Sequence, residues 1–325
     1  MPNIITHKLF AEEALKQMRK QDIREIIEKH PQIFYIGSNG PDFLFFSHAK
    51  PWEAYKSHAM NRLGSQMHST HINEFYEVAF RCIKEQKRED VKENMLAYIF
   101  GHLCHWALDK TTHPYVFYST GNCKGESAGH HHRFESMIDT MMLDKLRQID
   151  ISEYPYYEIC RYDEEMLKAI ARIYIRVARE VYHVDVKVNE LRETLNSWYD
   201  IQKLLYDPQD VKYRVLKKAE SLVRKPWAIS GNIVKAQIDD CYDVLNESKA
   251  VWKHPCDDHI TSNESFIELF NSAIPLATSI IEKAYGCVEY NASFSNVSDI
   301  LKDHAYDSGM DGEREMKYFD NIYER

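Results

Sequence analysis

The sequence predicts an all-α protein built as one helical domain, and three observations support this prediction. Apolar residues recur at steps of three and four along most of the 325 residues, which is the period of an α-helix buried on one side. Alternation of apolar and polar residues, the pattern of a half-buried β-strand, is nearly absent. The chain contains no internal repeat, low-complexity segment or visible linker. We therefore expect one domain over residues 1–285, followed by a more polar C-terminal extension over residues 286–325.

The individual helices follow from this period in chain order. Residues 7–20 place Phe10 and Ala14 on one side, and residues 91–108 repeat the same steps over a longer stretch. Further helices, several of them preceded by a Ser, Asp or Asn cap, are expected at residues 22–29, 72–84, 132–146, 164–182, 189–205, 210–222, 228–249 and 262–285. Glycine and proline signals predict a turn at residues 39–42 and loops at residues 110–129 and 252–263.

Composition excludes several classes of protein. The formal net charge is −9 and the basic residues are dispersed, so a nucleic-acid duplex is not an expected partner. The seven cysteines are scattered without a Cys-x-x-Cys pair, which argues against a disulfide framework and against a cysteine zinc site. No run of eighteen apolar residues occurs, and residues 1–20 lack the pattern of a secretory signal. We expect a cytoplasmic protein with no transmembrane segment, and the oligomeric state stays open.

The most informative stretch is residues 101–135, which holds six of the sixteen histidines. In the helix expected there, His102, His105 and Asp109 lie at i, i+3 and i+7, so they share roughly one face. His113 follows about one turn later. Imidazole nitrogens and carboxylate oxygens together are typical zinc ligands.

A second pair of the same kind starts the next expected helix. His131 and Glu135 lie at i and i+4 in the segment HHRFE. A single such pair is usually a surface salt bridge, but two pairs on neighbouring helices, preceded by a Gly-Pro-Asp turn that ends at Asp42, favour a metal site. Because carboxylates can bridge two ions, the pattern predicts a multinuclear hydrolytic centre.

Five segments carry a resemblance to a known family. They are ITHKLFAEEAL near the start, GPDFLFF, GSQMHSTH, HWALDKTTHP and GHHHRFE, and they span about the first 140 residues. In this order the chain resembles the zinc-dependent phospholipase C family, which is related to the bacterial phosphatidylcholine-cleaving phospholipases and more distantly to the S1/P1 nucleases. The resemblance implies a multi-helix bundle of the phospholipase C/P1 nuclease type with up to three zinc ions in a cleft.

The resemblance also implies roles for individual residues. Asp42, His68, His105 and Asp109 would hold one zinc ion. Asp109 would bridge to a second ion shared with His7. The third ion would be held by three residues that lie further along the chain, namely His113, His131 and Glu135. Asp42 would be the catalytic residue, acting as the general base.

The sequence departs from the secreted members of that family in three places. Those enzymes use a processed N-terminal tryptophan as a ligand, whereas this chain starts with Met-Pro; removal of Met1 would leave the amine of Pro2 as a possible ligand. The gap from Asp109 to His113 is about two residues shorter. Residues 150–285 are predicted to be helical, so no C-terminal β-sandwich for membrane docking is expected, and bilayers are not implied as the substrate.

Together these patterns predict a zinc-dependent, phospholipase C-like phosphodiesterase with two or three zinc ions as its only cofactor. Its substrate would be a small phosphoester or a phospholipid. The alternative is a noncatalytic zinc-binding helical module with a structural or sensing role. Two assignments stay open: His58 or His71 could replace His68, and His102 is expected to support a ligand or to pack rather than to bind metal.

Overall fold

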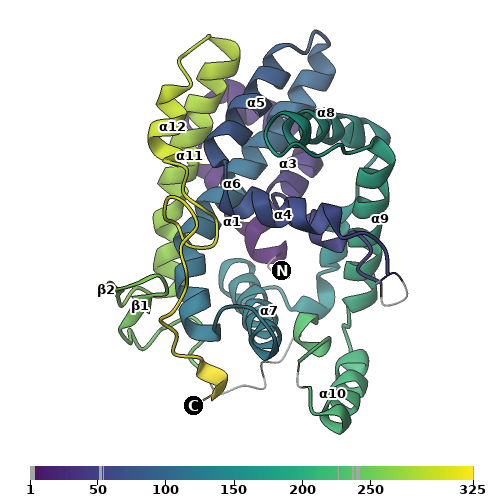
Figure 1. Ribbon diagram of the computed structural model, residues 1–325, viewed down its shortest axis with the longest axis vertical. Coiled ribbons are helices and arrows are strands. Elements are labelled where there is room, and N and C mark those ends of the chain that lie inside the picture. Colours follow the sequence, from purple (N-terminus) through teal and green to yellow (C-terminus); the bar gives the residue numbers. More distant parts are fainter. Residues whose placement is uncertain are drawn as a thin grey trace.

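The computed structural model describes residues 4–50, 53, 55–225, 227–235, 238 and 242–324, so Pro2 lies outside the described part. Twelve α-helices and one two-stranded antiparallel sheet form that part of the chain (Figure 1). The predicted all-α class is therefore confirmed. Within the described residues, no helix is both long enough and apolar enough to cross a membrane.

The elements run as follows along the chain. The helices are α1 (Ile4–Gln17), α2 (Gln21–Lys29), α3 (Pro31–Gly37), α4 (Ala59–Ser69), α5 (Ile72–Lys84), α6 (Glu89–Thr120), α7 (Glu126–Arg147), α8 (Glu164–Glu180), α9 (Val188–Leu205), α10 (Val211–Val223), α11 (Phe266–Glu289) and α12 (Ser295–Leu301). The short 3-10 helices used below are η1 (Asp42–Phe46) and η5 (Ser230–Asn232), and the strands are β1 (Trp252–His254) and β2 (Asp257–Ser262).

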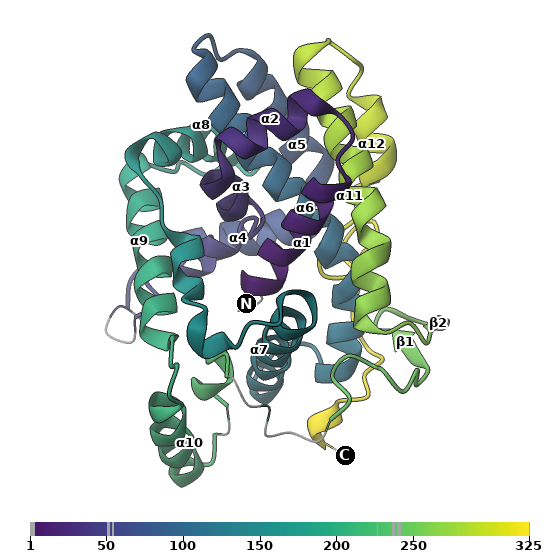
Figure 2. The same cartoon turned by 180° about the vertical axis from the view of Figure 1, so that it is seen from behind.

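Helix α6 is the centre of the fold. It is buried along most of its length, and α1, α3, α5, α8 and α11 pack around it (Figures 1 and 2). Two glycines let the backbones of α3 and α6 touch: a Cβ on Gly37 would lie 2.2 Å from the carbonyl oxygen of Tyr98, and one on Gly101 would lie 2.1 Å from that of Phe34. This close crossing fixes the turn that follows α3 and leads into η1.

The loop predicted at residues 110–129 is wrong at both ends, because α6 continues through Pro114 to Thr120 and α7 begins at Glu126. A proline inside a helix removes one backbone donor and crowds the carbonyl four residues earlier, which is why the sequence signalled a loop. Here the carbonyl oxygen of that earlier residue, Lys110, lies beside Gly309, where a Cβ would come within 2.3 Å. Most residues from Thr112 to Thr120 are buried, and the helix continues without a break, so Asp109 and His113 lie one turn apart on one face.

Two further predictions fail downstream. The helix expected at residues 228–249 is replaced in its described residues by η5 and turns. The carboxylate of Glu220 accepts the N–H groups of Ile229 and Ser230 at 2.7 and 2.8 Å, and thereby binds donors that could otherwise enter a helix. The loop expected at residues 252–263 is instead the hairpin β1–β2.

The C-terminal residues pack against the helical body. Helix α11 continues past residue 285, and α12 packs on α5 and α11 with Val297 and Leu301 buried. Tyr306 is also buried, and its N–H donates to the carbonyl oxygen of His68 at 2.8 Å. The division of the chain at residue 285 stays a prediction, but this contact links the C-terminal segment to the helix that carries His68.

Candidate metal centre

The structure brings all eight predicted metal-binding side chains into one buried cluster. They come from α1, η1, α4, α6 and α7, and none is more than 8% exposed. The members of the cluster are His7, Asp42, His68, His105, Asp109, His113, His131 and Glu135. Segments separated by more than one hundred residues therefore meet at one point next to α6.

Helix α6 supplies a row of three side chains at intervals of four residues. Asp109 lies in the middle of this row and uses both carboxylate oxygens. Its Oδ1 is 3.3 Å from Nε2 of His7, and its Oδ2 is 3.1 Å from Nε2 of His105 and 3.6 Å from Nδ1 of His113. Each oxygen of this carboxylate therefore contacts a different imidazole.

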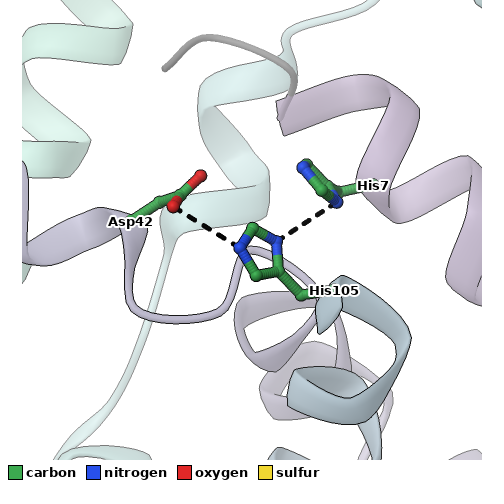
Figure 3. A group of neighbouring side chains, drawn as sticks. All are labelled: His7, Asp42 and His105. Atoms are coloured by element: carbon green, nitrogen blue, oxygen red, sulfur yellow. Dashed lines mark hydrogen bonds and ion pairs between the residues drawn. The ribbon is translucent and has the colours of Figure 1, made fainter. Parts of the chain in front are cut away.

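His7 and Asp42 approach His105 from opposite sides, as Figure 3 shows. Nδ1 of His7 lies 3.3 Å from Nδ1 of His105, and Oδ1 of Asp42 lies 3.5 Å from its Nε2. His7 sits near the start of α1, where the N–H of Thr6 donates to the buried carboxylate of Asp139 at 2.8 Å. Sequence reasoning missed Asp139, because an aspartate that fixes the start of a helix more than 130 residues away leaves no local signal.

Gly40 holds the turn before Asp42 against the cluster. Its φ of 52° lies in the left-handed region, and a Cβ at this position would come within 2.1 Å of the His105 ring. Only glycine readily adopts this φ and also leaves room for the His105 ring. The turn can therefore place Asp42 beside His105 without displacing that imidazole.

The structure distinguishes His68 from its alternatives. His58 and His71 are exposed, whereas His68 is buried with its Nε2 3.0 Å from Oδ1 of Asp42. Nδ1 of His68 lies 2.7 Å from the carbonyl oxygen of Gly64, and since a carbonyl can only accept, Nδ1 carries a proton. Nε2 is thus the atom that His68 presents to the cluster.

A hydrogen bond from Nδ1 of His131 to Thr120 likewise leaves Nε2 of His131 to face the cluster. The Thr120 hydroxyl donates to the carbonyl oxygen of Val116 at 2.7 Å, so its oxygen accepts from Nδ1 of His131 at 3.0 Å. Nε2 of His131 then faces Oε1 of Glu135 at 3.3 Å, and Nε2 of His113 lies 3.6 Å from the same oxygen. Thr120 was not predicted, because it lies in the stretch expected to be a loop.

His102 does not join the cluster. It is fully buried, stacks on Phe75 with ring centroids 4.7 Å apart, and has its Nδ1 2.9 Å from the hydroxyl of Tyr76. This agrees with the expectation that it packs. His130, next to His131, instead has its Nδ1 2.9 Å from the side-chain amide nitrogen of Asn321.

Several polar atoms of the cluster have no hydrogen-bond partner among the described residues. Four of these buried atoms are Nε2 of His105, Oδ2 of Asp109, Nδ1 of His113 and Oε2 of Glu135. Unsatisfied buried polar atoms are costly, and a cation bound between them would remove that cost. Nitrogen and oxygen donors of this kind fit zinc.

Nitrogen and oxygen atoms of the cluster form three groups, and within each group these atoms all lie within 4.8 Å of one another. The groups are His7, Asp42 and His105; His68, His105 and Asp109; and His113, His131 and Glu135. The third group matches the set that the family resemblance implied for one ion. The resemblance placed Asp42 with His68 at one ion and His7 at another. In the structure, Asp42 lies beside His68 and is also grouped with His7.

Without a bound ion, the cluster forms internal ion pairs. Burial opposes protonation of His68, but its pairing with Asp42 prevails and raises its pKa to about 9. Burial also opposes protonation of His113, and the charges of Asp109 and Glu135 outweigh it, raising its pKa to about 10. Burial disfavours ionised Asp42, yet His105 and His68 hold its pKa below the usual range. A metal ion must therefore displace protons from these imidazoles.

This arrangement predicts how the stability of chelator-treated protein depends on pH. Both imidazoles titrate near 6.5 when unfolded, so their contribution is complete below about pH 6.5 and is lost as pH rises through 9 and 10. We expect the free energy of unfolding to fall by about 1–3 kcal/mol per pH unit between pH 7 and 9. Urea unfolding in the presence of EDTA measures this slope. Replacing His68 and His113 by Gln should flatten it; an unchanged slope would contradict the ion pairs.

The cluster opens into a large cavity. The cavity has a volume of about 1850 Å³, and His113 and His131 lie in its wall. Asp307, from the C-terminal segment, lines the same space, and its negative charge contributes to the raised pKa of His113. Most of the remaining wall beyond the cluster is apolar and comes from α9, α10 and the segment around Ile229. A substrate with a polar and an apolar part would fit such a space.

Comparison with known proteins gives one match. A family model described as zinc dependent phospholipase C matches residues 6–184, more than half of the chain. Neither the curated proteins nor the solved structures contain a match. The matched stretch includes all eight residues of the cluster and ends before α9 begins.

Proposed function

Because this chain belongs to the zinc-dependent phospholipase C family, we propose that it hydrolyses the phosphodiester bond of phospholipids at a zinc centre formed by the eight-residue cluster. The unsatisfied nitrogen and oxygen atoms next to a mostly apolar cavity are the observation that carries this proposal. They combine donors for a metal ion with space for a lipid.

The cluster has donors for two or three zinc ions. One ion would bind to His113, His131 and Glu135, and Asp109 would bridge two ions. Three ions with four ligands each need about twelve bonds, whereas eight residues, with one of them bridging, supply about nine. Unless carboxylates bind through both oxygens, some positions stay open to water, as catalysis requires.

The protein side chains would have distinct roles in the reaction. Bound zinc would supply an activated water and neutralise charge on the phosphate group. Asp42, whose pKa is held low, is ionised at neutral pH and can accept the proton of the attacking water at the edge of the cluster. Thr120 would keep His131 in the tautomer that presents Nε2.

The test is a hydrolysis assay on a soluble phosphodiester. We expect purified protein without a polyhistidine tag to hydrolyse bis-p-nitrophenyl phosphate, a chelator to abolish the activity and zinc to restore it. The rate should rise through about pH 6 to 8 as water at the metal ionises. Zinc-loaded protein with no turnover on phosphodiesters, phosphomonoesters or short-chain phospholipids would instead support a noncatalytic zinc-binding module.

We also propose a cytoplasmic location. Six of the seven cysteines lie in the described part of the chain, and none of them forms a disulfide there. Reduced thiols are typical of the cytosol.

A further inference from the structure

Helix α10 carries an apolar row that is exposed at the surface of the protein, next to the cavity. Val211, Val215 and Leu222 lie at i, i+4 and i+11, on one side of the helix, and are 50%, 64% and 80% exposed. The other side carries Tyr213 and Glu220, which are both buried. Figures 1 and 2 show α10 beyond the end of α9, at the edge of the molecule. A surface helix normally turns its apolar side inward, so this orientation needs an explanation.

Polar contacts on the inner side hold α10 in this orientation. Glu220 accepts the N–H groups of Ile229 and Ser230, as described above, and its Oε2 accepts the hydroxyl of Ser230 at 2.5 Å. At the start of the helix, Asp207 accepts the N–H of Tyr213 at 2.8 Å. Rotating the helix to bury its apolar row would break these buried hydrogen bonds, which is costly.

The charge around α10 differs in sign from that of the whole chain. Residues 203–225 contain seven basic side chains, namely Lys203, Lys212, Arg214, Lys217, Lys218, Arg224 and Lys225. The same stretch has three acidic residues, Asp207, Asp210 and Glu220, so its formal charge is +4. The formal net charge of the whole chain is −9. Asp207 and Glu220 are buried. The exposed surface of α10 is therefore apolar with a basic border.

The apolar row is continuous with the wall of the large cavity into which the cluster opens. Val211 and Val215 line the cavity that also contains His113 and His131. Leu204 and Leu205, at the end of α9, extend the same apolar wall. The helix thus lies at the mouth of the space in which the proposed reaction takes place.

We propose that α10 docks the protein on an anionic phospholipid bilayer, with its apolar row in the region between headgroups and acyl chains. The basic side chains would then lie against anionic headgroups. This inference deepens the proposed function and rests on it, because it names the surface from which the lipid enters the cavity. A second copy of the chain is a poorer occupant, since pairing two such helices would bring two basic borders together.

The experiment measures co-sedimentation of the zinc-loaded protein with vesicles. We expect the parent to bind vesicles of phosphatidylcholine with phosphatidylglycerol, and to bind less at high salt. Replacing Val215 and Leu222 by Glu should weaken binding at least ~100-fold, because two apolar side chains are lost and two repelled charges are added. Val251→Glu is the matched control, since Val251 is 67% exposed but precedes β1, and it should bind as the parent does.

A charge variant tests the basic border separately. Lys218→Glu with Arg224→Glu should lower affinity for the phosphatidylglycerol vesicles about 10-fold or more, and should change binding to pure phosphatidylcholine far less. Circular dichroism and zinc content establish that each variant is folded.

Three results would overturn the proposal: a parent that stays in the supernatant, a Val215 and Leu222 variant that binds as well as the parent, or a parent dimer that this variant dissociates. Turnover of phosphodiesters, phosphomonoesters and short-chain phospholipids is measured on the parent in parallel. Hydrolysis without vesicle binding contradicts docking alone, whereas vesicle binding without hydrolysis upholds docking and contradicts the proposed reaction.

Discussion

Asp109→Ala should remove more than one equivalent of zinc and lower turnover by at least ~10³-fold. Asp109 is 2% exposed, and its two oxygens lie within 3.3 Å of imidazole nitrogens of His7 and His105, so one substitution removes a donor from two neighbouring positions. The negative charge of Asp109 would also offset the repulsion between two cations bound in the cluster, and the substitution removes that charge. Metal analysis after gel filtration, together with the hydrolysis assay, measures both effects.

The same substitution should destabilise the zinc-loaded protein more than the chelated protein. In the chelated protein it removes the carboxylate that faces His113, and the gain from that ion pair is partly offset by the burial that raises the pKa of Asp109. In the zinc-loaded protein, the stabilisation by bound metal, about 4 kcal/mol at a thousandfold excess over Kd, should largely disappear. Asp90→Ala, at the exposed start of the same helix, should keep the parent's zinc content. Equal zinc in parent and Asp109→Ala protein would refute the bridging role.

Asp42→Asn should reduce turnover by at least ~10²-fold while most of the metal stays bound. The amide keeps an oxygen next to His68 and His105 but cannot accept a proton from water. Because the side chain keeps its size, the turn after Gly40 should not move. Steady-state kinetics with zinc analysis separates loss of a base from loss of a ligand.

Asp185→Asn provides the comparison for this variant, because the Asp185 side chain is 83% exposed and pairs only with Arg179 among the described residues. It should retain the activity of the parent. Full turnover in Asp42→Asn would remove Asp42 from the role of base, and loss of most of the zinc would make it chiefly a ligand.

The sequence by itself determined the helical class and the family, and it named eight residues that the structure brings into one cluster; their role as metal ligands stays a prediction. The family match over residues 6–184 confirms the resemblance that the sequence segments indicated. Two pairs of the cluster follow from short spacings: the four-residue step from His105 to Asp109 or from His131 to Glu135 places both side chains on one face of any helix that contains them. His7, Asp42 and His68 were named only through the family resemblance.

Local patterns failed where other contacts outweigh local preference. Pro114 signals the end of a helix, yet α6 continues because it is buried among its neighbours. Residues 228–249 have a helical period, but the buried carboxylate of Glu220 takes the N–H groups at their start. The contacts around Pro114 come from distant helices, whereas Glu220 lies only a few residues before the predicted helix; in neither case does the apolar period reveal the contact.

Only the tertiary structure decided which atoms face one another in the centre. It distinguished buried His68 from exposed His58 and His71, and it revealed the supporting hydrogen bonds of Thr120 and Asp139. It also turned the apolar row of α10 outward, although the sequence of that helix is compatible with either orientation. Spacing along a helix fixes which side chains share a face, but the direction of that face depends on the packing of the whole chain, which no short stretch of sequence contains.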